Sequence, residues 1–173
     1  MSELDKNSRE AIKKVLQDEG DLIVLELLSR MASEDANATG KTSKSLRSRV
    51  SVLKRGEINF DIVGGEGWKF VEQGRGKTKS STKGQPPLIE SIKKWMRARG
   101  IRPEGGTKGF NSLAFVITRR IHQEGTLINR LGERRDIYSS VVTQERIDKI
   151  INKIAVAGEV EMLTDLTALY KLK

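Results

Sequence analysis

A change in hydrophobic period near residue 50 is the feature that most limits the fold of this chain. Before it, apolar residues recur at helical spacing, as in Leu22, Leu25, Leu28 and Met31. After it, apolar and polar residues alternate in three runs that contain Val50 and Val52, then Ile58, Phe60 and Ile62, then Trp68 and Phe70. The first spacing is typical of an amphipathic helix, and the second of strands with one buried face. The sequence therefore predicts an α+β fold, in which a small three-stranded antiparallel meander is packed by an N-terminal helix.

Breaks in these patterns predict where the first elements end. Residues 54–56 and 64–67 are expected to turn between the strands. Ser8 is a candidate helix cap and Gly20 a break, so the N-terminal region fits either one kinked helix or two helices in line. Residues 35–45 are polar and are predicted to form a loop.

Two helices joined by a glycine-rich loop are predicted after the strands. The first starts at residues 86–87, which are both proline, and ends at Gly100, with Ile101 placed for the hydrophobic contact of a C-terminal cap. The second runs from Asn111 or Ser112 to Gly125. An apolar stripe is expected to hold the first of these helices on the sheet, and it consists of Leu88, Ile89, Ile92, Trp95 and Met96.

The C-terminal region is predicted to be helical. Thr143 or Gln144 opens a helix that Gly158 is expected to interrupt, and residues 159–173 also fit helical spacing. Residues 137–142 fit either a strand or an extended lead-in. The topology of the last fifteen or so residues stays open at this level.

The charge is concentrated in the middle of the chain. The 173 residues fit a single domain with an N-terminal helical segment (1–36), a basic sheet-plus-helix core (37–142) and a C-terminal helical segment (143–173). The core segment carries 22 Lys and Arg against 9 Asp and Glu, whereas the N-terminal segment carries 5 against 9. Such a basic region can contact nucleic acid or an acidic protein surface, or it can simply be solvated.

The composition offers little for catalysis or metal binding. The chain contains no cysteine, which excludes disulfides, thiol nucleophiles and cysteine-ligated zinc in it. His122, its one histidine, is explained by a charge–dipole contact near a helix end. Glu66 and Glu72 are expected to be solvated strand ends. We therefore expect no cofactor, no metal and no enzymatic activity, and the short apolar runs predict a soluble protein without a membrane span.

The tripeptide Gly-Lys-Thr occurs at residues 40–42 and 76–78 and raises the question of nucleotide binding. A phosphate-binding loop of this type needs another glycine five residues before the glycine of that tripeptide. Those positions hold Asp35 and Val71. The helix that should follow the lysine is also not predicted for residues 79–85, which lead into two prolines. Nucleotide binding is therefore rejected.

Two basic loops are the remaining candidate contact sites, for either DNA or neighbouring subunits. The first loop, residues 74–85, contains Arg75, Lys77, Lys79 and Lys83, and the second, residues 125–136, contains Arg130, Arg134 and Arg135. Because the first loop has no apolar side chain, it cannot offset the entropy of ordering. We expect it to be mobile in the isolated protein and ordered in an assembly. A separate core or interface stripe is predicted from Trp68, Phe70, Leu88, Ile92 and Trp95.

Three stretches, in this order and spacing, resemble the neck or tail-completion proteins of tailed bacteriophages, the head-to-tail connectors. They are FVEQGRG (70–76), GQPPLIESIKKWMRARGI (84–101) and SLAFVITRRIHQEGT (112–126). In that family a strand ends in a "VE-x-G" turn, a basic variable loop follows, and a Pro-Pro helix and a helix ending in "GT" come next. The resemblance spans residues 40–140, and residues 159–173 have no counterpart in it.

The resemblance implies a structural virion protein with no cofactor and no reaction. Proteins of this family form a homo-oligomeric ring in the neck of the virion, with the portal or connector protein above and a tail protein below. The resemblance therefore implies synthesis in the host cytoplasm, assembly at the head-tail junction, and an axial channel in which the basic loops face genomic DNA or adjacent protein. A second hypothesis is a free DNA-binding module that uses the basic core segment. A third is a nuclease, but the sequence supplies no recognisable set of metal ligands and catalytic residues for one.

Overall fold

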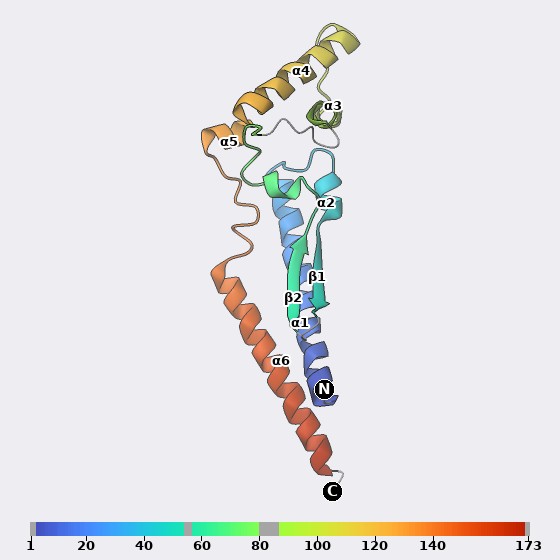
Figure 1. Ribbon diagram of the computed structural model, residues 1–173, viewed down its shortest axis with the longest axis vertical. Helices are drawn as coiled ribbons and strands as arrows, with labels where there is room; N and C mark the ends of the chain where they lie inside the picture. Colours follow the sequence, from blue (N-terminus) through green and yellow to red (C-terminus); the bar gives the residue numbers. More distant parts are fainter. Residues whose placement is uncertain (1–2, 54–56, 80–86, 172–173) are drawn as a thin grey trace. The chain divides into compact units, whose positions relative to one another are not determined.

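The computed structural model describes residues 3–53, 57–79 and 87–171, which form a mixed helix-and-strand fold (Figure 1). The elements, in chain order, are α1 (Glu3–Ser33), α2 (Lys41–Ser45), β1 (Arg47–Val52), β2 (Ile58–Val63), the 3-10 helix η1 (Trp68–Phe70), α3 (Leu88–Ala98), α4 (Gly106–Glu124), α5 (Leu127–Leu131) and α6 (Gln144–Lys171). The predicted mixture of helices and antiparallel strands is therefore confirmed. The predicted turn at residues 54–56 lies outside the described residues.

The chain divides into two compact units. Unit 1 comprises residues 1–30, 45–64 and 138–173, and unit 2 comprises residues 31–44 and 65–137. Unit 1 therefore holds most of α1, the β1–β2 hairpin and α6, whereas unit 2 holds η1 and α3 to α5.

In unit 1, α1 packs along an antiparallel pair of strands, as the sequence predicts. β1 and β2 pair in a register that runs from Arg47 opposite Val63 to Val52 opposite Ile58. Gly20 of α1 makes the close approach, since a Cβ added there would lie 2.6 Å from the Cβ of Ser48. α1 runs beside the hairpin in Figure 1.

Hydrogen bonds and ion pairs add to the packing of α1. The side-chain amide of Gln17 donates through Nε2 to the hydroxyl of Ser48 over 2.6 Å. On α6, Arg146 Nη1 lies 2.6 Å from Glu26 Oε2, and Lys153 pairs with Glu19. α1 thus bonds both to the hairpin and to α6.

The buried face of α1 matches the predicted run only in part, since Met31 of that run is fully buried. Leu16, Ile23 and Leu27 are buried, whereas Leu22 and Leu25 are more than half exposed. Each step of three residues turns by 300°, which is 60° less than a full turn. Residues spaced by three therefore shift from one face of the helix to another. Steps of seven and eleven residues return to nearly the same direction, which keeps Leu16, Ile23 and Leu27 on one face.

The predicted third strand is wrong. Residues Trp68–Phe70 form η1, in which the amide of Trp68 donates to Gly65 O over 2.9 Å and that of Phe70 to Gly67 O over 3.0 Å. The sheet of the described residues therefore has the order β1-β2 alone. The glycine-rich turn before η1 continues into it through i to i+3 hydrogen bonds. The alternating run at residues 68–70 has only three members, which is too short to favour a strand over such a turn.

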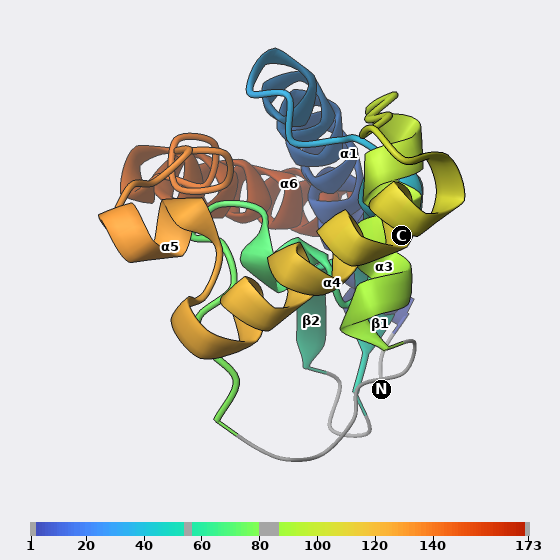
Figure 2. The ribbon, with the colours of Figure 1, turned by 90° about the horizontal axis from the view of Figure 1, so that it is seen from above.

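Unit 2 is organised by the crossing of α3 and α4, which Figure 2 shows. Met96 on α3 and Ala114 on α4 have no exposed surface. The helix that packs on α3 is therefore α4, while the sheet on which the α3 stripe was expected belongs to unit 1. α4 also begins at Gly106, more than a turn before its predicted start.

The C-terminal cap of α3 confirms its prediction in detail. The amide of Gly100 donates to Arg97 O over 3.1 Å, and that of Ile101 donates to Met96 O over 2.9 Å. Gly100 has a φ of 66°. These two bonds and the positive φ define a Schellman motif, which glycine favours because it has no Cβ.

Residues after α4 differ in part from the prediction. Gly125 ends α4 as expected, but the next loop contains the short helix α5. Residues 137–142 form turns and bends rather than a strand. α6 starts at Gln144, with the Thr143 hydroxyl accepting from the amide of Arg146 over 3.3 Å, and it continues through Gly158 without interruption.

Candidate functional site

The basic charge belongs to one of the two units. Counted over the sequence, unit 2 holds 18 Lys and Arg and 9 Asp and Glu, a difference of +9. Unit 1 holds 14 of each and is neutral. The whole net charge of the chain therefore lies on the unit that contains both predicted basic loops, where it can attract a polyanion.

Unit 2 brings the beginnings of these two loops together. The amide of Arg75 donates to the hydroxyl of Thr126 over 2.9 Å. In return, the amide of Thr126 donates to Arg75 O over 2.8 Å. Asn129 Nδ2 donates to Gln73 O over 3.4 Å. We call residues 73–78 and 122–130 together the loop junction.

Glycine is needed on both sides of the loop junction. Gly74 has a φ of 70°, and a Cβ there would lie 2.3 Å from Thr126 Oγ1. Gly125 has a φ of 90°, and a Cβ there would lie 2.8 Å from Arg75 O. Both values are in the left-handed region and both contacts are too short for a side chain, so the two segments can approach this closely only with glycine.

The end of α4 extends the loop junction. The amide of Thr78 donates to His122 O over 3.0 Å. The hydroxyl of Thr78 also lies 2.7 Å from His122 Nδ1, and Arg75 Nη2 donates to that hydroxyl over 3.2 Å. His122 therefore has a hydrogen-bonding role that links the first loop to the end of α4, in addition to its expected place near a helix end.

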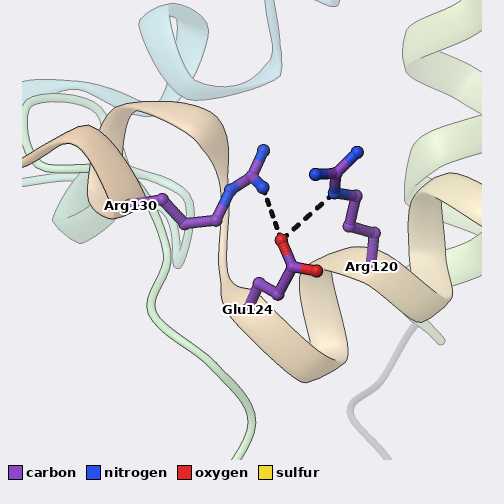
Figure 3. A network of polar contacts seen from close by, with 3 residues as sticks. All are labelled: Arg120, Glu124 and Arg130. Atoms are coloured by element: carbon purple, nitrogen blue, oxygen red, sulfur yellow. Dashed lines mark hydrogen bonds and ion pairs between the residues drawn. The ribbon is translucent and has the colours of Figure 1, made fainter.

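An ion-pair network joins α4 and α5 at the loop junction. Glu124 Oε2 accepts from Arg120 Nε over 3.1 Å and also pairs with Arg130 (Figure 3). The hydrogen bond from Arg120 is the main cause that lowers the pKa of Glu124 below its ordinary value of 4.5, with Arg130 adding to it. One carboxylate thus orients two guanidinium groups from different helices.

The predicted contact residues of the two basic loops differ in how far they are exposed to solvent. Lys77 and Lys79 are exposed, and Arg134 is exposed on the second loop. Arg135 is half-buried, and its amide donates to Glu72 O over 3.2 Å. Lys83 lies outside the described residues, as do residues 80–86 as a group, so the predicted mobility of the first loop stays a prediction.

Glu72 is a residue that the sequence placed wrongly. Its side chain is only 1% exposed, whereas a solvated strand end was expected. The error follows from the wrong third strand, because a strand that ended there would have carried Glu72 into solvent. The residues around Glu72 in the sequence carry no signal of this burial.

The predicted apolar stripe is only partly buried. Trp68, Leu88 and Ile92 are half-buried, whereas Phe70 and Trp95 are exposed to 38% and 37%. The fully buried centre of this part is Met96. Whether the stripe residues serve as an interface stays a prediction.

Two kinds of feature were sought in the described part of the chain, clustered metal ligands and helices that could span a membrane. Within residues 3–53, 57–79 and 87–171, no group of three His, Cys, Asp or Glu could hold a metal ion. The helices built from these residues include none that is both long and apolar enough to cross a bilayer.

Comparisons with protein-family models, with curated proteins and with solved structures return no match to this chain. Its class is therefore argued from the sequence stretches and the contacts that they make.

Proposed function

We propose that this protein is a structural component of a tailed-bacteriophage virion that forms a ring in the neck, between the portal or connector of the DNA-filled head and the tail. One observation carries the proposal. Two of the stretches that resemble neck proteins, 70–76 and 112–126, meet at the loop junction through the bonds between Arg75 and Thr126. Two of the stretches in the resemblance therefore contact each other in the fold, which supports treating them as parts of one pattern.

The charge distribution suits a ring around a DNA channel. A basic unit 2 and a neutral unit 1 give each subunit one region that attracts a polyanion and another that does not. In a ring, every subunit presents the same region toward the axis, so a modest attraction per subunit is multiplied. The exposed Lys77, Lys79 and Arg134 are then expected to face DNA or the adjacent adaptor protein. The proposal includes no reaction and no cofactor.

The experiment that tests this proposal uses phage particles made without the protein. We expect filled or leaking heads without attached tails in electron micrographs. Supplying the protein from a plasmid should restore tailed particles. Normal tailed particles in its absence would overturn the proposal, as would a genomic position with no virion genes nearby.

The alternative function is a free DNA-binding module, and the observation that favours it is the confinement of the +9 charge to unit 2. It predicts that the purified chain binds plain duplex DNA with an affinity that falls with salt, by about 0.9 in log–log slope per phosphate contact. Glutamine at Arg75, Lys77, Lys79 and Lys83 should then reduce both the affinity and the slope. A matched control carries glutamine at four positions of unit 1, which are Lys6, Lys14, Arg47 and Lys149. Failure of the parent chain to retain DNA at low salt would exclude this alternative.

A further inference from the structure

A groove lies in unit 2 where α3 ends and α4 begins, with a volume of about 590 Å³. Two arginines, Arg97 and Arg102, line it together with the apolar Ile101, Pro103 and Phe110. Neither arginine belongs to the two basic loops that the sequence singles out, at residues 74–85 and 125–136. The groove is therefore a basic site that the sequence patterns do not mark.

Both arginines of this groove are available to a partner. Arg97 and Arg102 are exposed. Among the residues that the structure describes, no carboxylate forms an ion pair with either of them, whereas the nearby Arg99 pairs with Asp35. Guanidinium groups without a carboxylate partner favour an anionic ligand, to which each can donate two parallel hydrogen bonds.

An aromatic ring orients one of these arginines. The Cζ atom of Arg97 lies 5.4 Å from the centroid of the Phe110 ring, over its face. Phe110 is half-buried on α4, which packs on α3. A guanidinium that stacks on a ring keeps the N–H groups at its edge free to donate. Arg97 thus has an ordered position, and the ring face that it covers is closed to an apolar partner.

The two helices that form the groove are also rich in positive charge. Residues 88–124, from the start of α3 to the end of α4, hold 8 Lys and Arg and 3 Asp and Glu, a difference of +5. Two of these acids are paired within the same helices, Glu90 with Lys93 and Glu124 with Arg120. The third, Glu104, is exposed on the loop and does not line the groove. More than half of the +9 of unit 2 therefore belongs to α3, α4 and their connection.

We propose that this groove binds the phosphate backbone of DNA, with Arg97 and Arg102 donating to phosphate oxygens. The centre of a protein interface is poor in charge and needs exposed apolar anchors. This groove offers the reverse, because its arginines are exposed while Ile101, Pro103 and Phe110 are half-buried. Phosphate contacts of this kind do not depend on the base sequence. The inference rests on the proposed function and deepens it, since it names the part of each subunit that meets the genome in the neck.

Salt-dependent DNA binding by the purified full chain tests the groove. Fluorescence anisotropy with a labelled duplex of arbitrary sequence gives the affinity from about 50 to about 200 mM salt. Arg97→Gln combined with Arg102→Gln removes two phosphate contacts, so the log–log slope should fall by about 0.9 for each, or about 1.8 in all. The affinity at the lowest salt should fall at least about tenfold. Arg97→Lys combined with Arg102→Lys keeps both charges and should keep the slope.

The matched control removes two exposed lysines of unit 1, with Lys6→Gln and Lys14→Gln in one chain. It loses the same charge as the double glutamine variant of the groove, and it should bind DNA like the wild type. A groove variant with the slope of this control would overturn the inference, as would a wild-type chain that binds no duplex at the lowest salt.

An acidic protein is the competing occupant, and a polyglutamate peptide represents it in the same assay. If the wild type binds this peptide, and the double glutamine variant of the groove loses the peptide but keeps its affinity for DNA, the groove belongs to an acidic protein and the inference is overturned. The neck proposal is scored separately, by tail attachment in particles made without the protein.

Discussion

Gly74→Ala is the substitution that tests the loop junction most directly. An alanine there must adopt a φ of 70°, which costs about 1–2 kcal/mol, partly offset by about 0.4–1 kcal/mol from the stiffer unfolded chain. Its Cβ would also lie 2.3 Å from Thr126 Oγ1, so the hydroxyl must move. Moving it costs the hydrogen bond from the Arg75 amide, worth about 1 kcal/mol, and local repacking of about 1 kcal/mol or more. We expect a total loss of about 3 kcal/mol in the free energy of unfolding.

Gly132→Ala is the matched control for this prediction. Gly132 has the same φ of 70°, but a Cβ there would meet nothing within 4 Å, so only the backbone cost applies. Denaturant unfolding should therefore show a loss of about 1 kcal/mol or less for Gly132→Ala. Hydrogen exchange of the Arg75 and Thr126 amides should speed up in Gly74→Ala alone. Equal stability losses and unchanged exchange in the two variants would refute the argument that steric exclusion holds the loop junction.

Three further predictions concern other parts of the fold. Gly20→Ala should destabilise the protein by about 1–3 kcal/mol in thermal unfolding, because the new Cβ would clash with side chains of β1 and β2. A Cβ at residue 158 would meet no atom within 4 Å, so Gly158→Ala should stabilise α6 by up to about 1 kcal/mol. Because the folded pKa of Glu124 is lowered, its stabilising effect is present above pH about 4.5 and is lost as the pH falls through that lower pKa. Glu124→Gln should therefore reduce the fall of the melting temperature as the pH is lowered below about 4.5. Met96→Ala, which empties a site with no exposed surface, should cost about 2–5 kcal/mol in denaturant unfolding, and a loss below about 1 kcal/mol would contradict the role given to it between α3 and α4.

Signals within a few residues of one another predicted their elements well. Pro87 and Gly100 bound α3 as expected, and Gly125 ends α4. Each of these residues acts through its own backbone conformation, which neighbours along the chain are sufficient to determine. Hydrophobic period was less reliable, because Leu22 and Leu25 fit a helical spacing and yet lie on the exposed side of α1.

Contacts between distant residues could not be predicted in this way. The bond of Arg75 to Thr126 joins residues 51 apart in the chain. Glu72 is buried although the alternation of its neighbours predicts a solvated strand end. The sequence did predict that both segments are basic, but not that they meet.

The sequence by itself determined the helical and strand classes of most segments, the caps of α3 and the surplus of positive charge, since these depend on composition and on local backbone preferences. Only the tertiary structure decided that the surplus lies on one compact unit, that Gly74 and Gly125 allow the two basic loops to touch, and which faces of α1 and α4 stay exposed. Those features arise from close packing between segments far apart in sequence, where exclusion at 2–3 Å selects one arrangement among many that the local pattern permits.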